Sequence, residues 1–141
     1  MTIQLIAAET FTELQLAYAG AQIIAGFPSP AEDYLESGLD LNQALIKHPS
    51  ATFYGRVKGE SMQEAGVEDG DLLIIDKSLN YKDQALAVCC LNGEFTLKRI
   101  KKGPDGIWLV PANRDYPPIP VGEEDDFTVW GIVTYIIKKV Y

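Results

Sequence analysis

Two residues of the chain, Ser61 and Lys98, are of types that can together cleave a peptide bond. A serine hydroxyl becomes a nucleophile only when a base removes its proton. Histidine is the usual base, but the only histidine, His48, precedes Pro49 at the end of a predicted helix and has no acidic residue in its own segment to orient it. We therefore interpret His48 as a surface or capping residue. A lysine can act instead if burial disfavours its charged form and lowers its pKa below about 10.4.

Lys98 is the lysine most firmly placed within a predicted strand, Glu94–Lys101, rather than in a loop. Side chains alternate between the two faces of a strand, so Thr96, Lys98 and Ile100 share one face. Thr96 is thus placed to hydrogen-bond the Lys98 amine and orient it. Taken alone, the pattern equally fits a solvated lysine on a strand.

Ser61 is the first residue of a Ser-x-x-Glu pattern that ends at Glu64. This pattern is typical of a capping box at the start of a helix. The two interpretations are compatible, because the unpaired backbone N–H groups at a helix start can also stabilise an oxyanion.

Composition and charge limit the classes of fold and function that the chain can have. The chain has 141 residues, of which 47% are apolar, and a formal net charge of -8. This describes one ordinary globular domain, whose acidity argues against direct nucleic-acid binding. The first basic residue is Lys47, so we expect no N-terminal domain that binds specific DNA sequences.

The two cysteines, Cys89 and Cys90, are adjacent. Neighbours on a strand point to opposite faces, so we expect two buried or half-buried thiols rather than a disulfide or a metal site. No apolar run reaches the length of a membrane span. We expect a cytoplasmic protein without cofactor, metal or membrane anchor.

From residue 52 onward, short apolar runs predict a mainly β domain. Asn92-Gly93 lies between two of the runs and predicts a type I′ hairpin turn. The last run is apolar on both faces, which predicts that the interior or a partner subunit covers it. The predicted strands are Thr52–Lys58, Leu72–Asp76, Ala85–Leu91, Glu94–Lys101, Ile107–Val110 and Phe127–Lys138.

The front of the chain has weaker patterns. Residues 1–25 keep no sustained period and predict an arm, with Thr10 and Glu13 as a capping box for a short helix. Residues 26–32 have the composition of a linker. Within them, Ser29-Pro30 predicts the start of a short helix that Gly38 ends. Asp40 with Gln43 predicts a second short helix that stops before Pro49.

Several ordered blocks resemble the LexA/UmuD family of self-cleaving serine peptidases. The resemblance covers about residues 26–141 and implies the family's fold, a curled β domain like that of signal peptidase, with short helices and an N-terminal arm. The blocks are Gly59-Glu60-Ser61-Met62, Asp69-Gly70-Asp71 leading into Leu72–Asp76, Gly93–Arg99, Pro111-Ala112-Asn113 and Tyr116–Ile119.

Within this family the chain resembles the UmuD branch, accessory subunits of the error-prone DNA polymerase V. The segment before residue 26 is short for a repressor's helix-turn-helix domain and has no basic residue. Gly26–Ala31 is similar to the start of the processed UmuD form, and so is the stretch from Asp40 to Thr52.

The resemblance implies specific roles. Ser61 is the nucleophile, Lys98 the base, and the backbone N–H groups of Glu60 and Ser61 hold the oxyanion. The family cleaves after a small residue and before glycine, so the Ala25-Gly26 bond is the expected substrate, which divides the chain into an arm, 1–25, and a peptidase domain, 26–141. The implied partners are a second copy in a homodimer, a RecA filament on single-stranded DNA that stimulates cleavage, and a UmuC-like polymerase subunit in SOS mutagenesis and translesion synthesis.

Three alternatives remain open. The first is a Ser-Lys hydrolase with an external substrate, such as signal peptidase, which would need a membrane anchor. The second is a non-enzymatic polymerase-binding module in which Ser61 only caps a helix. The third is a LexA-like repressor fragment, which sequence-specific DNA binding would support.

Overall fold

The computed structural model describes residues 2–7, 15–19, 35–59 and 65–141. They belong to two compact units, one of residues 1–8 with 48–141 and one of residues 9–47. The predicted boundary between residues 25 and 26 lies outside the described residues and stays a prediction. The same holds for the short helix expected at Thr10 and Glu13 and for the helix start expected at Ser29-Pro30.

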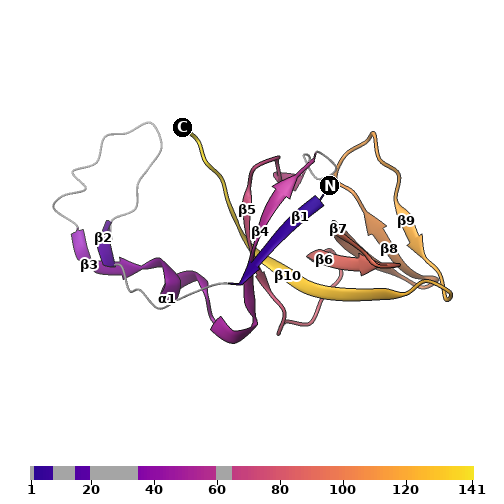
Figure 1. Ribbon diagram of the computed structural model, residues 1–141, viewed down its shortest axis with the longest axis horizontal. Coiled ribbons are helices and arrows are strands. Elements are labelled where there is room, and N and C mark those ends of the chain that lie inside the picture. Colours follow the sequence, from indigo (N-terminus) through magenta and orange to yellow (C-terminus); the bar gives the residue numbers. More distant parts are fainter. Residues whose placement is uncertain (1, 8–14, 20–34, 60–64) are drawn as a thin grey trace. The chain divides into compact units, whose positions relative to one another are not determined.

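In the larger unit, the described strands form one antiparallel sheet (Figure 1). The predicted mainly β fold is confirmed, and each strand predicted after residue 51 is present to within two residues. In sheet order the strands are β1 (Thr2–Ala7), β4 (Thr52–Lys58), β5 (Leu72–Asp76), β10 (Phe127–Ile137), β6 (Leu86–Leu91), β7 (Glu94–Gly103), β8 (Gly106–Val110) and β9 (Ile119–Val121). Two strands of the sheet, β1 and β9, were not predicted.

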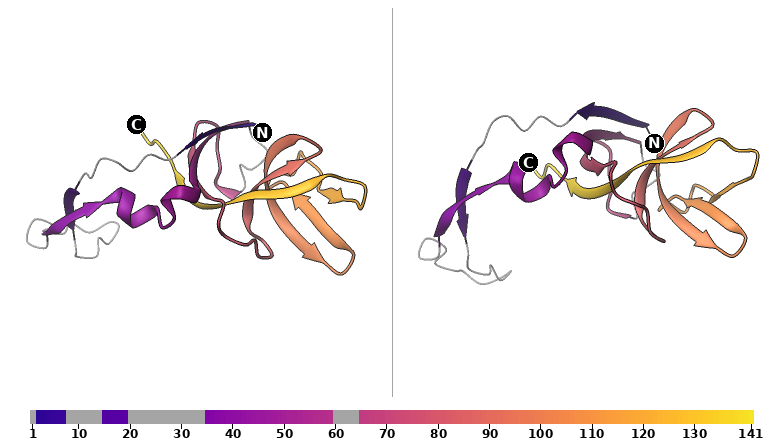
Figure 2. Two further views of the ribbon diagram at one scale, coloured as in Figure 1. Left: turned by 60° about the horizontal axis from the view of Figure 1, so that its bottom comes forward. Right: turned by 90° about the horizontal axis from the view of Figure 1, so that it is seen from below.

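β10 joins the two halves of this sheet. Its first half pairs with β6 and its second half pairs with β5, so the strand runs the length of the unit (Figure 2). β1 also contacts β7, although the two are not neighbours in the sheet. The sheet therefore curls, as expected for this fold.

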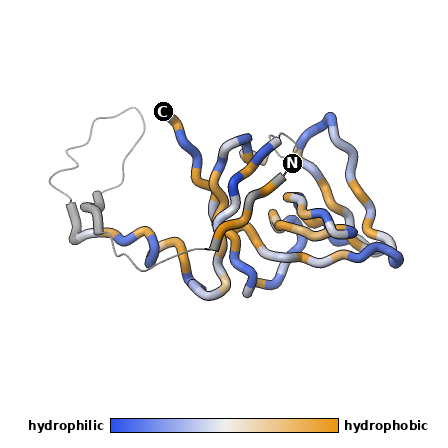
Figure 3. The backbone as a smooth tube through the Cα atoms, viewed as in Figure 1, coloured by the Kyte–Doolittle hydropathy of each residue, from blue (hydrophilic) through white to orange (hydrophobic). Residues whose placement is uncertain are grey.

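Successive residues of β6 and β7 alternate between two buried apolar clusters, so both faces of these strands are covered. Hydrophobic residues accordingly follow the strands, whereas hydrophilic residues gather at the outer turns (Figure 3). One cluster contains Val57, Val67, Leu73, Ile75, Val88 and Leu97. The other contains Ala87, Cys89, Ile100 and Leu109.

The turn between β6 and β7 confirms the type I′ prediction. Asn92 and Gly93 have φ values of 50° and 85°, and Leu91 pairs with Glu94. A two-residue turn fixes the register in which the two strands that it joins, β6 and β7, pair with each other.

The two faces of β10 are covered only in part. Val129 and Val133 are half-buried, but Tyr135, Ile136 and Ile137 are 43%, 37% and 42% exposed. The interior thus covers the first half of this strand, and cover of its end by a partner subunit stays a prediction.

The smaller unit contains β2 (Gln15–Ala19), β3 (Leu35–Asp40) and the short helix α1 (Leu41–Leu45). Asp40 caps α1, with its carboxylate accepting a hydrogen bond from the Asn42 N–H at 3.1 Å, so the predicted second helix is confirmed. The predicted continuation of the first helix to Gly38 is wrong, because residues 35–40 pair with β2 as a strand. Strand pairing here outweighs the local helix pattern. A 3₁₀ turn, η2 (Pro49–Ala51), belongs to the larger unit and directly precedes β4.

No helix among the described residues is both long enough and apolar enough to cross a membrane.

Gly131 is a tight point of the sheet, at an irregularity in the pairing of β10 with β6. A Cβ there would lie 2.6 Å from Cγ2 of the fully buried Ile75. We predict that Gly131→Ala lowers the free energy of unfolding by about 1–3 kcal/mol through overpacking. Urea denaturation measures this, with Gly103→Ala as the matched control, because a Cβ at Gly103 has only ordinary contacts. Equal stability of the two variants would contradict the packing argument.

Candidate active site

The Lys98 amine is enclosed within the sheet. The residue is 6% exposed, and its Nζ donates hydrogen bonds to Thr96 Oγ1 at 2.8 Å and to the Leu97 carbonyl oxygen at 3.1 Å. The bond to Thr96 is the one that strand alternation predicts. These two bonds fix the direction of the amine within the sheet.

The β6 residues opposite Lys98 and Thr96 help to bury the Lys98 amine, and burial sets its pKa. Ala87 pairs with Lys98 and Cys89 pairs with Thr96, and both Ala87 and Cys89 are fully buried. Burial removes solvent from the amine and lowers the pKa of Lys98 below its ordinary 10.5, against a smaller opposing effect of Cys89. Burial also raises the pKa of Cys89 to about 12, so this thiol stays neutral near pH 7. The site thus favours a neutral lysine.

Glu60 and Ser61 lie within residues 60–64, outside the described residues, and Ala25 and Gly26 lie within residues 20–34, also outside them. The structure therefore describes Lys98 and Thr96, but not the predicted nucleophile, oxyanion groups or scissile bond. Their roles stay predictions. The residues on both sides of the Ser61 segment are described.

Asp69 holds the residue that leads into the Ser61 segment. Gly59 follows β4 with φ 107°, and its backbone N–H donates to Asp69 Oδ1 at 3.0 Å. Asp69 belongs to one of the family blocks, and the sequence pattern assigned it no role. The Asp69-Gly70 pair was the signal in the sequence for this role, because an aspartate at a tight turn commonly accepts backbone N–H bonds. Gly70 does adopt a turn conformation, with φ 89°.

The far side of the segment is tied down as well. Val67 is fully buried, and the Gly70 N–H donates to the Val57 carbonyl at 2.8 Å. Asp71, 4% exposed, accepts bonds from the Glu68 N–H at 2.8 Å and from the Lys138 ammonium at the end of the sheet. The hydrogen bond with Asp71 raises the pKa of Lys138. Both ends of the Ser61 segment are thus attached to the body.

His48 has an acidic partner that its own segment does not reveal. Its Nδ1 lies 2.6 Å from Asp76 Oδ2 at the end of β5, and the side chain is half exposed. Burial acts to raise the pKa of Asp76, but hydrogen bonds from Ser78 and His48 outweigh it and lower the pKa. Ser78 Oγ bonds Asp76 Oδ1 at 2.5 Å, whereas in a catalytic triad the serine bonds the imidazole ring. The group fits a structural role.

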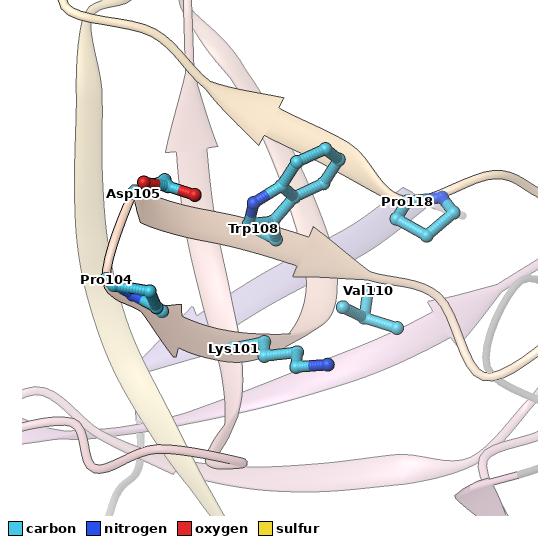
Figure 4. A pocket seen from close by; sticks show the side chains of 7 residues that line it. Lys101, Pro104, Asp105, Trp108, Val110 and Pro118 are labelled. Carbon is cyan, nitrogen blue, oxygen red and sulfur yellow. The ribbon is translucent and has the colours of Figure 1, made fainter.

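A cavity of about 310 Å³ lies beside the hairpin of β7 and β8. Lys101 and Trp108 line it, with Pro104, Asp105, Val110 and Pro118 (Figure 4). Lys101 is three residues from Lys98 on one strand, so the two side chains leave β7 on opposite faces. This cavity is separate from the Lys98 site. Among the described residues, no group of three or more His, Cys, Asp and Glu side chains could hold a metal ion.

Comparison with known proteins places the chain. The family model "Peptidase S24-like" matches residues 17–134. The chain belongs to this family. The matched range includes Lys98, Ser61 and the Ala25-Gly26 bond.

Individual relatives agree with this placement. Protein MucA of Escherichia coli is 39% identical over 115 residues, which cover 81% of this chain and 78% of that protein. Protein SamA of Salmonella typhimurium is 42% identical over 82% of this chain and 79% of its own length. The LexA repressor of Acidithiobacillus ferrooxidans is 37% identical over 96% of this chain and 66% of its own length.

We predict that the Lys98 amine titrates below 10.5, because its protonated form lacks solvent. NMR of the chain labelled with ¹³C at lysine Cε measures this, with Lys98→Met identifying the resonance. A midpoint at or above 10.5 would show that the buried site does not favour the neutral amine.

Proposed function

We propose that the chain is a UmuD-like peptidase that cleaves its own Ala25-Gly26 bond, with Ser61 as nucleophile and Lys98 as general base. The observation that carries this proposal is the buried Lys98 amine, held by Thr96 with its pKa lowered, in a chain of the Peptidase S24-like family. A solvated lysine would be protonated near pH 7 and unable to accept a proton.

In the first half of the reaction, neutral Lys98 takes the proton of Ser61 Oγ as this oxygen attacks the carbonyl carbon of Ala25. The carbonyl oxygen becomes an oxyanion, which the backbone N–H groups of Glu60 and Ser61 stabilise. The Lys98 ammonium then gives its proton to the departing nitrogen of Gly26. The C–N bond breaks and an ester joins Ser61 to Ala25.

In the second half, Lys98 is neutral again and removes a proton from water. The hydroxide attacks the ester, Ser61 recovers its proton from Lys98, and the arm 1–25 leaves with a free carboxylate. The bond and the catalytic groups belong to one chain, so proximity replaces a binding step. Each chain reacts once.

Thr96 and Asp69 act in this proposal as positioning residues. Thr96 Oγ1 fixes the direction of the Lys98 amine, and Asp69 fixes Gly59, two residues before Ser61. Thr96 acts through the Lys98 amine that it contacts, and Asp69 acts through Gly59.

The cellular role follows from the UmuD resemblance. A RecA filament on single-stranded DNA stimulates cleavage by favouring the arm pose that brings Ala25 to Ser61. The processed chain serves a UmuC-like polymerase in SOS mutagenesis. It forms a homodimer in the cytoplasm, for which the exposed Tyr135, Ile136 and Ile137 offer an apolar surface.

We predict that the purified chain, incubated at mildly alkaline pH, slowly yields a fragment beginning at Gly26, and that a RecA filament accelerates this. Intact-mass spectrometry follows the reaction. Ser61→Ala and Lys98→Met each slow it by roughly 10³-fold or more, because each removes one member of the pair. Thr96→Val slows it about tenfold through loss of one hydrogen bond, and Thr96→Ser restores it.

Lys101→Met is the matched control, since Lys101 lies on the same strand with its side chain on the other face. It leaves the rate unchanged. Full cleavage by Lys98→Met would exclude the proposed base, and a fragment beginning elsewhere would exclude the proposed bond.

A further inference from the structure

β1 forms one outer strand of the described sheet, and its strand partner there is β4. The antiparallel register runs from Thr2 opposite Lys58 to Ala7 opposite Phe53. Under the proposed function β1 lies in the released arm, before the Ala25-Gly26 bond. The inference below rests on that proposal for the release of β1.

The inner side of β1 fills an apolar seat on the body of the sheet. Ile3 and Leu5 pack against the buried cluster that contains Val57, whereas Ile6, on the other face of the strand, is 49% exposed. Gly55 pairs with Leu5, and a Cβ at Gly55 would lie 2.8 Å from Ile3 Cγ2. The glycine therefore leaves room for a branched side chain from the outer strand.

The backbone of β4 shows which groups β1 satisfies. The Val57 N–H donates to the Asp71 carbonyl and the Val57 carbonyl accepts from the Gly70 N–H, so the backbone of Val57 faces away from β1. Orientation alternates along an antiparallel strand. The N–H and C=O groups of Tyr54, Arg56 and Lys58 therefore face β1, and those of Phe53, Gly55 and Val57 face β5.

We propose that loss of the arm converts β4 into an open edge that binds an extended segment of a partner protein in place of β1. The seat selects apolar side chains two residues apart, as Ile3 and Leu5 are. Between them Gln4 lies opposite Arg56, with Lys58 next along that face, so an acidic side chain at that position complements the edge. The partner segment thus has the pattern apolar, acidic, apolar and adds a strand to the sheet.

The test uses the full chain carrying Ser61→Ala, so that self-cleavage does not interfere. Ile3→Asp detaches β1, and Ile6→Asp is the matched control on the exposed face. Hydrogen exchange by NMR is read at six of the seven β4 amides, those of residues 53–58. In the Ile3→Asp chain, exchange at Tyr54, Arg56 and Lys58 rises at least about tenfold, and the other three amides stay protected by β5. The control leaves all six unchanged.

The probe for the open edge is a peptide with the sequence of residues 1–8. It restores slow exchange at the three exposed amides, and a peptide with Glu at the position of Gln4 binds about two- to fivefold more tightly. A peptide with Asp at the position of Leu5 fails to restore protection. No restoration by the parent peptide, or association of the detached chain with itself instead, overturns the proposal.

The remaining outcomes are also decisive. If the Ile3→Asp chain loses protection at all six amides, the body does not stand without β1 and the proposal fails. Self-cleavage is scored separately by mass in the chain with Ser61 intact. A chain that never yields the Gly26 fragment but shows the edge response refutes the proposed cleavage alone, and the reverse result refutes the edge site alone.

Discussion

A lysine amine enclosed by protein loses the water that keeps it protonated, and Lys98 is in this position. The rest of the candidate site depends on that burial. The two-residue turn at Asn92-Gly93 sets Ala87 opposite Lys98 and Cys89 opposite Thr96, and both of these β6 residues are fully buried. β10 pairs with the other edge of β6 and so keeps the β6–β7 hairpin within the curled sheet. The pKa of Cys89, raised by burial, ensures that the neighbouring thiol adds no negative charge that would return Lys98 to its protonated state.

The frame around the Ser61 segment complements this arrangement. Asp69 holds Gly59 on one side, and the buried Val67 with the tightly bonded Asp71 holds the other. The arm that the proposed cleavage releases is also part of the sheet, because its strand β1 pairs with β4 at one edge. In the proposed account, one cut therefore ends the reaction and changes the surface of the product.

Much of this arrangement was predictable because it depends on local patterns. Alternation placed Thr96 and Lys98 on one face, Asn92-Gly93 gave the turn, and counting back from that turn would have given Ala87 and Cys89 as the neighbours. Other features depend on contacts distant in sequence. Leu35–Gly38 has a plausible helix pattern but pairs with β2, and the acidic partner of His48 comes from β5. β1 has three successive apolar residues, 5–7, that break its alternation, and β9 has only three residues with a proline between them. Neither shows a period, and pairing makes them strands.

The central claim is that a neutral Lys98 activates Ser61, and the pH dependence of Ser61 reactivity tests it most directly. A fluorophosphonate modifies an activated serine without requiring the arm to dock, and mass spectrometry locates the adduct. Because the base must be neutral, the modification rate rises with pH through the pKa of Lys98 and levels off below 10.5, the ordinary lysine value. The account predicts this profile at Ser61 and its loss in Lys98→Met. An adduct that forms at the same rate in Lys98→Met would contradict the account.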